Sequence, residues 1–370
     1  MQLLFLISCV ILLLYVAMIV SFWVGWRRTP WFEVPEVKSQ QLPMVSLVVC
    51  CRNEECALPA LLHSIEKQKY SPFEVIFSDD HSSDRTAELL ALYAAQHQNV
   101  RIVRPEKSGK KYALQKAVES AVGELICCTD ADCVLHENHL LRFAEYYAVI
   151  PSDLILGGVR LSHSDSLFEK LQALEFLSLQ ASTAGSAGLG CPVMCNGANL
   201  AFRKEVWQAS ANCLRERTPS GDDVFFLQSL KKRGGTIRFL KNAETIVTTS
   251  ACPTPKAFFA QRTRWTSKTV YYTDLQTILV ALLVLCSVVV VLFWAVVAFF
   301  SIANAYAFFA FFFFKFLIDT LFVGNVLPFF GERKLRGYTF CLSLVYPFYV
   351  LTSAVGGFVG TKTWKNRKFR

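Results

Sequence analysis

The segment Leu125–Asp132 reads Leu-Ile-Cys-Cys-Thr-Asp-Ala-Asp, an apolar run that ends in two carboxylates separated by one residue. A short apolar run bounded by polar residues predicts a buried β-strand. Similar runs at residues 44–50, 73–77 and 100–103 also predict strands. Between them, apolar residues recur at helical spacing, as in the segment 112–122. Alternating strands and helices at this spacing predict an α/β fold with a parallel sheet and right-handed crossovers.

Polar motifs follow the predicted strands at the points where the strands end. They are Arg52-Asn53-Glu54-Glu55, Asp79-Asp80, the segment Arg104–Lys111, and Asp130-Ala131-Asp132. In open parallel sheets, ligands bind beyond the carboxyl ends of the strands. We therefore expect these motifs to line one ligand site.

The candidate metal ligands are Asp130 and Asp132, because two carboxylates at one strand exit can turn toward a single cation. Hard divalent cations prefer oxygen ligands and bridge to phosphates in this way. A lone Asp-x-Asp triplet is more often a pair of solvated loop residues. Asp80 could accept an N–H of a uracil ring if Ser83 and Asp84 cap the next helix instead.

Phosphate binding is a second expectation for this edge of the sheet. Lys110 and the backbone N–H of Gly109 lie just before a predicted helix, an arrangement that suits an anion. On this segment alone, a solvated basic loop is equally compatible with the sequence.

Two further motifs lie beyond the predicted strands. A carboxylate of Gly221-Asp222-Asp223 can act as a general base on a hydroxyl, although an acidic helix N-cap is the plainer alternative. Gln261-x-x-Arg264-Trp265 can form an interfacial helix anchored by Trp and Arg. The same residues could contact a diphosphate and an acceptor sugar, and the two roles are compatible.

Membrane-length apolar segments lie at both ends of the chain, which is 53% hydrophobic and 18% charged. The segments are residues 3–24, 275–300, 303–323 and 338–359, each long enough to span a bilayer. A cleaved signal peptide is disfavoured because the first run is too long and no cleavage site follows. Lys315 and Asp319, four residues apart in the third segment, could pair on one helix face.

The basic residues predict the topology. Arg27 and Arg28 place the N-terminus outside and the following domain in the cytoplasm. The loop 331–337 and the tail 362–370 are both basic, yet one predicted span separates them. Either that span is re-entrant or interfacial, or the tail violates the positive-inside rule. The net charge of +9 follows membrane edges and has no nucleic-acid recognition motif with it, so we expect no nucleic-acid partner.

The chain has 13 cysteines, an odd number. The neighbours Cys50–Cys51 and Cys127–Cys128 lie in predicted strands, where adjacent side chains point to opposite faces. They therefore indicate small core residues and not disulfides, consistent with reduced thiols in a cytosolic domain.

Five motifs occur in one order, and together they resemble family 2 of the glycosyltransferases. The motifs are Cys51-Arg-Asn-Glu-Glu55, Asp79-Asp-His-Ser-Ser-Asp84, Asp130-Ala-Asp132, Gly221-Asp-Asp223 and Gln261-x-x-Arg264-Trp265. This is the GT-A (Rossmann-like) group that includes cellulose, chitin and hyaluronan synthases and ceramide glucosyltransferase. The resemblance covers about residues 43–268.

The resemblance implies a role for each motif. Asp223 would be the catalytic base, although Gly221-Asp222 replaces the family's Thr-Glu. The nucleotide and donor residues would be Arg52, Asn53, Glu54, Asp80, Lys110 and Asp130. Mg²⁺ or Mn²⁺ would be held by Asp130 and Asp132. The acceptor and diphosphate residues would be Asn196, Gly197, Asp222, Gln261, Arg264 and Trp265.

The predicted organisation has six parts. They are a transmembrane helix (1–26), a linker (27–42), a GT-A domain (43–255), an interfacial helix (256–274), a C-terminal membrane region of about three segments (275–361) and a basic tail (362–370). The predicted protein is an integral, multi-pass membrane protein with a cytoplasmic catalytic domain, and a bacterial inner membrane is the expected location.

The predicted activity is metal-dependent, inverting transfer of a hexosyl or N-acetylhexosaminyl group from a nucleotide sugar, expected to be UDP-linked. The acceptor would be a lipid, a lipid-linked sugar or a glycan, and membrane lipids are the other expected partners. One alternative is a processive polysaccharide synthase, although no Phe-x-Val-Thr-x-Lys segment follows the Gln-x-x-Arg-Trp motif. Another is a non-catalytic membrane subunit, which retention of the acidic motifs disfavours.

Overall fold

The computed structural model describes residues 1–33, 42–210, 221–359, 362–364 and 367–369. Its contacts divide the chain into two compact units. The sheet unit comprises Pro30–Ser162, Met194–Ser250 and Thr361–Arg370. The helical unit comprises Met1–Thr29, His163–Val193 and Ala251–Gly360. Parts of the predicted linker and basic tail lie outside the described residues.

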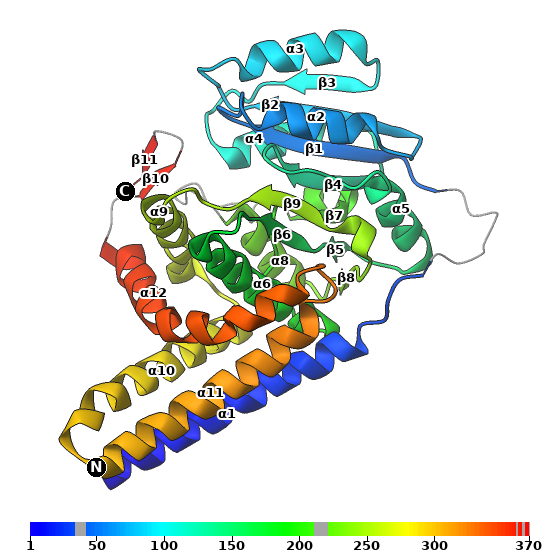
Figure 1. The fold of residues 1–370 in the computed structure, drawn as a ribbon. Coiled ribbons are helices and arrows are strands. Elements are labelled where there is room, and N and C mark those ends of the chain that lie inside the picture. Colours follow the sequence, from blue (N-terminus) through cyan, green and yellow to red (C-terminus); the bar gives the residue numbers. More distant parts are fainter. Residues whose placement is uncertain (34–41, 211–220, 360–361, 365–366, 370) are drawn as a thin grey trace. The chain divides into compact units, whose positions relative to one another are not determined.

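The first half of the sheet unit alternates strands and helices as predicted (Figure 1). Its strands are parallel and lie in the order β3-β2-β1-β4. The strands are β1 (Val45–Cys51), β2 (Phe73–Asp79), β3 (Val100–Val103) and β4 (Leu125–Asp130). The helices between them are α2 (Leu58–Glu66), α3 (Thr86–Gln96) and α4 (Lys110–Ser120).

The second half makes the sheet mixed, and here the expectation of a purely parallel sheet was incomplete. Strand β7 pairs antiparallel with both β4 and β5, and β8 pairs parallel with β5. Among the described residues, the sheet has seven strands in the order β3-β2-β1-β4-β7-β5-β8. These added strands are β5 (Leu154–Leu156), β7 (Leu200–Arg203) and β8 (Ile237–Phe239).

Shorter elements complete the sheet unit. A parallel pair is formed by β6 (Val159–Ser162) and β9 (Val247–Ser250), and an antiparallel pair by β10 (Lys362–Trp364) and β11 (Arg367–Phe369). The helices are α5 (His139–Val149), α7 (Lys204–Ala209), α8 (Asp222–Lys232) and the 3₁₀ turn η2 (Ala243–Thr245).

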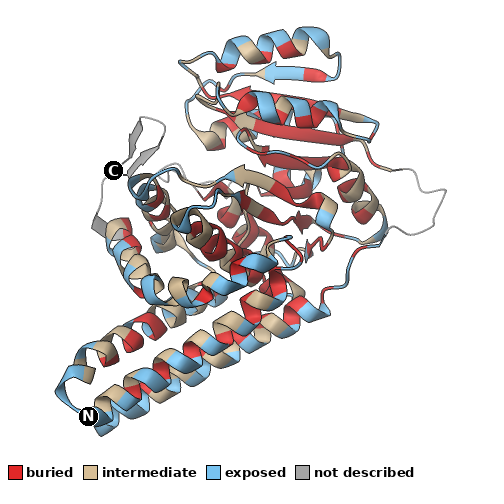
Figure 2. Cartoon of the chain, viewed as in Figure 1, coloured by how far each residue is buried: buried red, intermediate tan, exposed pale blue. Residues whose placement is uncertain are grey.

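The core of this unit lies on the central strands, which are the most buried elements in Figure 2. Cys51, Cys127 and Cys128 are buried there, and every cysteine in the described part of the chain is a free thiol. The prediction that these cysteines are core residues is confirmed. Burial raises the pKa of all three thiols, so they stay protonated and behave as small apolar side chains.

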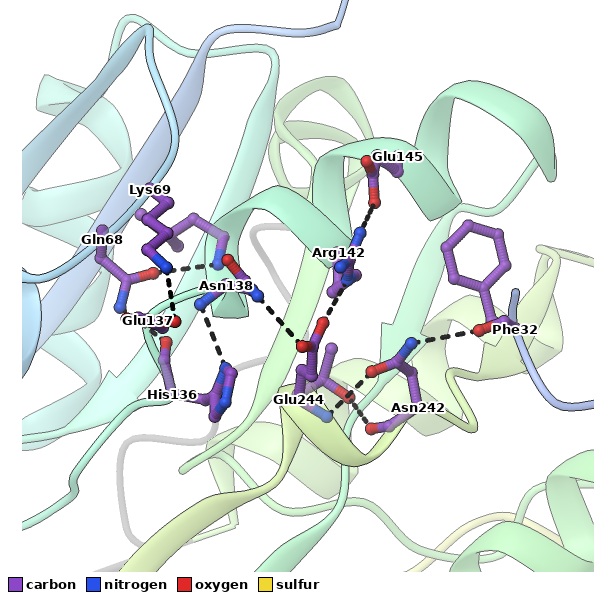
Figure 3. A network of polar contacts seen from close by, with 12 residues as sticks. Phe32, Gln68, Lys69, His136, Glu137, Asn138, Arg142, Glu145, Asn242 and Glu244 are labelled. Carbon is purple, nitrogen blue, oxygen red and sulfur yellow. Dashed lines mark hydrogen bonds and ion pairs between the residues drawn. The ribbon is translucent and has the colours of Figure 1, made fainter. Parts of the chain in front are cut away.

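A polar network ties the start of α5 to the turn η2 and to the chain entering the unit (Figure 3). Glu244 accepts hydrogen bonds from Asn138 and Arg142. Asn242 donates to the carbonyl oxygen of Phe32 at 3.1 Å, and the Phe32 ring packs edge-on against Tyr146 at 5.1 Å. The residues that follow the first helix are therefore fixed to the sheet unit.

The helical unit contains four helices that are long and apolar enough to cross a membrane, counting only described residues. They are α1 (Gln2–Arg28), α10 (Leu275–Val297), α11 (Ile302–Val326) and α12 (Thr339–Val359). Figure 1 shows α1, α10 and α11 side by side. The other helices are α6 (Leu167–Gly188), α9 (Pro255–Thr266) and the 3₁₀ turns η3 (Thr269–Tyr271), η4 (Ala298–Phe300) and η5 (Arg333–Tyr338).

Helices α1 and α6 cross at glycines, which lets their backbones approach closely. A Cβ atom placed on Gly25 would lie 2.0 Å from the carbonyl oxygen of Gly185. A Cβ atom on Gly188 would lie 2.1 Å from the carbonyl oxygen of Gly25. Small residues at a helix crossing let the two backbones come into direct van der Waals contact. Helices that pack within membranes commonly use such residues.

The predicted pair in α11 is confirmed. Lys315 Nζ donates to Asp319 Oδ2 at 2.7 Å and to the hydroxyl of Tyr15 in α1 at 2.9 Å. The Tyr15 hydroxyl in turn donates to Asp319 Oδ1 at 2.7 Å. Each charge is thus compensated between two helices, as an ionisable group in an apolar bundle requires.

Candidate active site

Strand register places two carboxylates on either side of the end of β1. Cys51 pairs with Asp79 on one neighbouring strand, and Cys50 pairs with Asp130 on the other. These strands are parallel, so their carboxyl ends meet at one edge of the sheet. The predicted gathering of polar motifs at this edge is therefore the observed arrangement.

The Arg52-Asn53-Glu54 segment interlocks with the loop after β2. Asn53 has a left-handed backbone, with φ of 51°, and its side-chain oxygen accepts the N–H of Ser83 at 2.8 Å. The backbone N–H of Glu54 donates to the hydroxyl of Thr86 at 2.8 Å. The predicted donor residues Asn53 and Glu54 thus belong to a pair of loops that hydrogen bonds join to each other.

Asp80 lies at the centre of the edge and is 1% exposed. Its Oδ1 atom accepts hydrogen bonds from the Ser108 hydroxyl and the Gly109 backbone N–H, each at 2.8 Å. Arg52 Nη1 donates to the Asp80 carbonyl oxygen at 2.5 Å and lies 3.9 Å from Oδ2. Gly109 has φ of 143°, which a residue with a side chain rarely adopts. Asp80 is therefore held as a fixed acceptor, as its predicted role requires.

Lys110 brings a positive charge to Asp130, whose Oδ1 atom lies 2.5 Å from its Nζ. Burial alone would lower the pKa of Lys110, but the charges of Asp130 and Asp222 raise it well above its ordinary value. The ammonium therefore stays charged. Asp222 is far from Lys110 in the sequence. Its electrostatic interaction with Lys110 nevertheless indicates that it lies near the same edge of the sheet.

Asp132 follows Asp130 at the exit of β4, and its side chain is solvent-exposed. Surrounding protein atoms and the charge of Asp130 raise the pKa of Asp132 above its ordinary value, while Lys110 acts in the opposite sense. Two carboxylates that repel each other at an open edge suit a divalent cation, which would stabilise both.

A cation at this edge would need further ligands. Within the described ranges, no group of three or more His, Cys, Asp or Glu side chains could hold a metal. Asp130 and Asp132 therefore fit a cation whose remaining ligands are waters or phosphate oxygens, the usual situation for Mg²⁺ at a nucleotide site.

The Asp222-Asp223 pair occupies the first turn of α8, after the N-cap residue Gly221 with φ of 107°. Asp223 Oδ2 accepts the backbone N–H of Gly197 at 3.1 Å, and Asn196 Oδ1 accepts the N–H of Ala198 at 3.0 Å. The structure thus brings together the predicted base and the predicted acceptor segment. Both acids are in the first turn, so the helix-dipole explanation is also satisfied.

Gln261, Arg264 and Trp265 lie on α9, in the helical unit. The Gln261 side-chain oxygen accepts from Arg262 Nη1 at 2.6 Å. The Arg262 guanidinium lies over the Trp265 ring, 4.2 Å from its centroid. Gln261 and Trp265 are therefore both held by Arg262 within their own unit.

Sequence analysis assigned the Gly109 N–H to a phosphate and did not single out Ser108, whereas in the structure both donate to Asp80. A Ser-Gly pair directly before a helix that starts with Lys110-Lys111 was the available signal. Cys50 was assigned to the core, yet it lies between Lys110, Asp130, Asp222 and Asp80. Burial and the charges of the three aspartates raise the pKa of the Cys50 thiol to about 12, while Lys110 acts in the opposite sense.

Comparison with known proteins agrees with this geometry. Residues 46–208 match the model of glycosyl transferase family 2. This part of the chain is therefore similar to family 2 glycosyltransferases, and we call it the family 2 domain for that similarity. That match covers the four parallel strands and their polar exits, and it ends before the Asp222-Asp223 pair.

Two curated relatives of the family 2 domain illustrate its range. An undecaprenyl-phosphate 4-deoxy-4-formamido-L-arabinose transferase from Pectobacterium carotovorum is 31% identical over 181 residues, covering 47% of this chain and 53% of the relative. A poly-β-1,6-N-acetyl-D-glucosamine synthase from Staphylococcus aureus is 26% identical over 146 residues, covering 39% of this chain and 35% of the relative. The chain therefore matches about half or less of the length of these relatives.

A solved structure with the same fold is a mannosyltransferase from Pyrobaculum calidifontis in complex with GDP-Man and Mn²⁺. It aligns with a TM-score of 0.61 at 16% identity, covering 96% of this chain and 99% of that one. This likeness confirms the predicted GT-A fold of the family 2 domain.

Proposed function

We propose that the chain is a membrane-embedded, inverting glycosyltransferase that uses a nucleotide-sugar donor, expected to be UDP-linked. The observation that carries the proposal is the gathering of Asp80, Lys110, Asp130 and Asp222 around the end of β1. Fixed acceptors, a charged ammonium and two carboxylates at a strand exit match the needs of a nucleoside diphosphate. The family 2 match supports the same reaction class.

Donor binding would begin at Asp80. Its carboxylate, held by Ser108 and Gly109, can accept an N–H of the base. The interlocked loops that contain Asn53 and Glu54 would enclose the base and ribose. Lys110 would neutralise phosphate charge, and Asp130 would contact the ribose and the cation.

A Mg²⁺ or Mn²⁺ ion held by Asp130 and Asp132 would, when bound, stabilise the charge that develops on the leaving diphosphate. From the protein side, Lys110 would contribute a positive charge that opposes the same developing charge. The open position of Asp132 leaves room for water and phosphate oxygens as the remaining ligands.

Asp223 would remove the proton from the acceptor hydroxyl. The hydroxyl oxygen then bonds to the anomeric carbon as the bond from that carbon to the diphosphate oxygen breaks on the opposite face, so the configuration inverts. The Gly197 N–H bond to Oδ2 orients the carboxylate. Asn196, Gly197 and Asp222 would border the acceptor, with Gln261 and Arg264 toward the diphosphate and Trp265 under an acceptor sugar.

The test of this assignment is Asp223→Asn. We expect turnover to fall by about 10²–10⁴-fold, the usual contribution of a general base, while affinity for the nucleoside diphosphate is unchanged. Transfer is measured on purified protein in lipid with a panel of UDP- and GDP-sugars, and affinity by calorimetry. Glu205→Gln, an exposed acid on α7, is the matched control for charge loss. Normal turnover in Asp223→Asn would refute the base assignment.

We infer that the acceptor receives one or a few sugars and is a lipid or lipid-linked glycan at the cytoplasmic membrane face. The small C-terminal membrane region supports this, since only three candidate spans follow the family 2 domain in the described part of the chain. The alternative is a processive synthase. Product length with excess donor discriminates between them, because a ladder of long products would favour the synthase.

A non-catalytic role is the third possibility, and an assay of nucleotide release from a nucleotide sugar tests it. Metal-dependent release of UDP or GDP from a nucleotide sugar by the purified protein would exclude it. Silence with every donor of the panel, in a folded preparation, would support it.

A further inference from the structure

The buried charge on α9 is Arg262, a residue that the Gln261-x-x-Arg264-Trp265 motif leaves unspecified. Arg262 is 2% exposed and pairs with Glu175 of α6, which is 1% exposed. The second carboxylate oxygen of Glu175 accepts the hydroxyl of Tyr349 in α12 at 2.6 Å. One buried ion pair therefore joins three helices of the helical unit.

Arg262 keeps its positive charge in this pair. Burial alone would lower the pKa of Arg262, but the neighbouring Glu175 carboxylate raises it above its ordinary value. Buried ion pairs contribute little net stability, because removing two charges from water costs about as much as their attraction returns. A role for the ion pair other than stability is therefore indicated by the residues that Arg262 contacts.

Arg262 contacts two of the three motif residues. Its Nη1 donates to the Gln261 side-chain oxygen at 2.6 Å, and its guanidinium lies 4.2 Å from the Trp265 ring centroid. The guanidinium also contacts Phe258, whose ring centroid is 4.7 Å from the guanidinium carbon. A planar guanidinium fixed by a carboxylate and rings can hold both neighbours in one orientation.

The bond to Gln261 has a chemical consequence. With its oxygen engaged by Arg262, the amide turns its two N–H donors away from the guanidinium. An anionic phosphate needs donors, and the flipped amide would present an oxygen and repel it. Arg262 thus selects the amide orientation that an anion can use.

We propose that Arg262, held by Glu175, is a positioning residue that orients the Gln261 amide as a hydrogen-bond donor to the diphosphate and fixes the plane of the Trp265 ring. The inference rests on the proposed function, which assigns Gln261 to the diphosphate. It adds Arg262 and Glu175 as residues on which diphosphate recognition depends.

The test compares a nucleoside diphosphate with its nucleoside, because only the former has the phosphates that Gln261 would contact. Affinities for UDP, GDP, uridine and guanosine are measured with Mn²⁺ on the purified full chain in lipid. Arg262→Lys keeps the charge beside Glu175 but loses the planar fork. We expect about a tenfold loss of diphosphate affinity, the effect of one misplaced hydrogen bond to a charged group, and unchanged nucleoside affinity.

Two further variants keep the test decisive if Arg262→Lys does not fold. Gln261→Glu can still pair with Arg262 but offers only oxygens, so diphosphate affinity should fall further than in Arg262→Lys. Glu175→Gln should also lower the diphosphate affinity, but by less than Arg262→Lys does. Lys256→Ala, an exposed residue of the same helix, is the control.

The outcomes separate the two proposals. An unchanged ratio of diphosphate to nucleoside affinity in folded Arg262 and Glu175 variants would overturn the positioning role, as would an equal loss for both ligands. Failure of the wild-type chain to bind either UDP or GDP would instead overturn the proposed function.

Discussion

Three acids at the candidate site have different surroundings, and these set their expected roles. Asp80 is buried and accepts two hydrogen bonds, so it is a fixed acceptor. Asp130 is paired with Lys110, and Asp132 is open to solvent beside it. Only the last has both a carboxylate neighbour and free access, which makes it the acid most sensitive to a bound cation.

We therefore predict that Asp132→Asn weakens metal binding more than nucleotide binding. Losing a charged ligand should lower Mn²⁺ affinity in the presence of UDP by at least about tenfold, since even indirect partners of a metal contribute 10–100-fold. Calorimetric titration of Mn²⁺ into the UDP-saturated protein measures this. Asp165→Asn, an exposed acid of the helical unit, is the control. Equal Mn²⁺ affinity in both variants would remove Asp132 from the metal site.

Glu74 gives the sheet unit a predicted pH dependence. This buried carboxylate of β2 accepts from the Ser46 hydroxyl and the Val122 N–H, each at 2.6 Å, and pairs with Arg101. Burial alone would raise the pKa of Glu74, but these hydrogen bonds and Arg101 lower it below its ordinary value of 4.5. The stabilisation is therefore complete above about pH 4.5 and is lost as pH falls through the folded-state pKa.

Glu74→Gln should accordingly destabilise the protein at pH 7 by about 1–2 kcal/mol, the cost of weakened buried hydrogen bonds. The difference from wild type should shrink as pH falls below about 4.5 and through the lower folded-state pKa of Glu74. Thermal unfolding in detergent at several pH values checks this, with exposed Glu119→Gln as the control. A difference that stays constant with pH would show that the charge of Glu74 is not the cause.

Asp80, Asp130 and Asp132 could be predicted from sequence because each ends or follows a strand, and a parallel sheet brings its strand ends together. The partners of Asp80 could not be predicted in this way, because Ser108 and Gly109 are separated from Asp80 by 28 and 29 positions in the sequence. Such contacts depend on how one loop folds over another. A hydrophobic pattern with a period of 2 or 3.6 residues contains no information on how two loops pack against each other.

At the scale of elements, the four parallel strands were predictable and the later ones were not. Strands β5 and β7 have three and four residues, too few to show a period. The antiparallel direction of β7 follows from the route of the chain between β6 and β7, which includes a whole helix of the other unit. Length and connectivity, and not side-chain pattern, decide that part of the sheet.

Helix α6 is the element that sequence analysis overlooked, although its end Ala181–Gly188 is almost entirely small residues. We predict that Gly185→Ala forces α1 and α6 apart, because the new Cβ would lie 2.4 Å from the Phe22 carbonyl oxygen. Overpacking of this kind costs about 1–3 kcal/mol, so the unfolding temperature should fall by several degrees.

The matched control is Gly337→Ala, where a Cβ would meet nothing within 4 Å. Both glycines lie in the helical unit, and both substitutions add one methyl group. Thermal unfolding in one detergent compares them. Equal midpoints for the two variants would show that the α1–α6 crossing can relax without cost.

For the whole molecule, the open question is whether α12 crosses the membrane. At about 1.5 Å per residue, its 21 residues would span about 31 Å, which is long enough. However, its second half packs on polar elements. Tyr349 bonds to Glu175, and the Ser353 carbonyl oxygen accepts from Thr266 of α9 at 2.8 Å. Helix α9 is the charged helix predicted to lie at the interface.

We infer that α12, whose partners are a buried ion pair and a helix predicted to be interfacial, lies at the level of that interface and not across the hydrocarbon. Pro347 within α12 and its exposed apolar residues Phe340, Leu344 and Phe348 suit a helix lying in the membrane surface. This arrangement resolves the conflict between the basic loop 331–337 and the basic tail. With α12 interfacial, both lie on the cytoplasmic side, as the positive-inside rule requires.

We therefore predict three true spans, α1, α10 and α11, and a cytoplasmic C-terminal tail. Green fluorescent protein fused after residue 370 should fluoresce, because it folds on the cytoplasmic side, and alkaline phosphatase at the same point should be inactive. The control is a pair of fusions after Ser301, between α10 and α11, which should give the opposite pattern. The opposite pattern at residue 370 would mean that α12 crosses the bilayer. Its contacts with the Glu175–Arg262 pair would then place that pair inside the membrane, where charged side chains are rare and depend on each other for compensation.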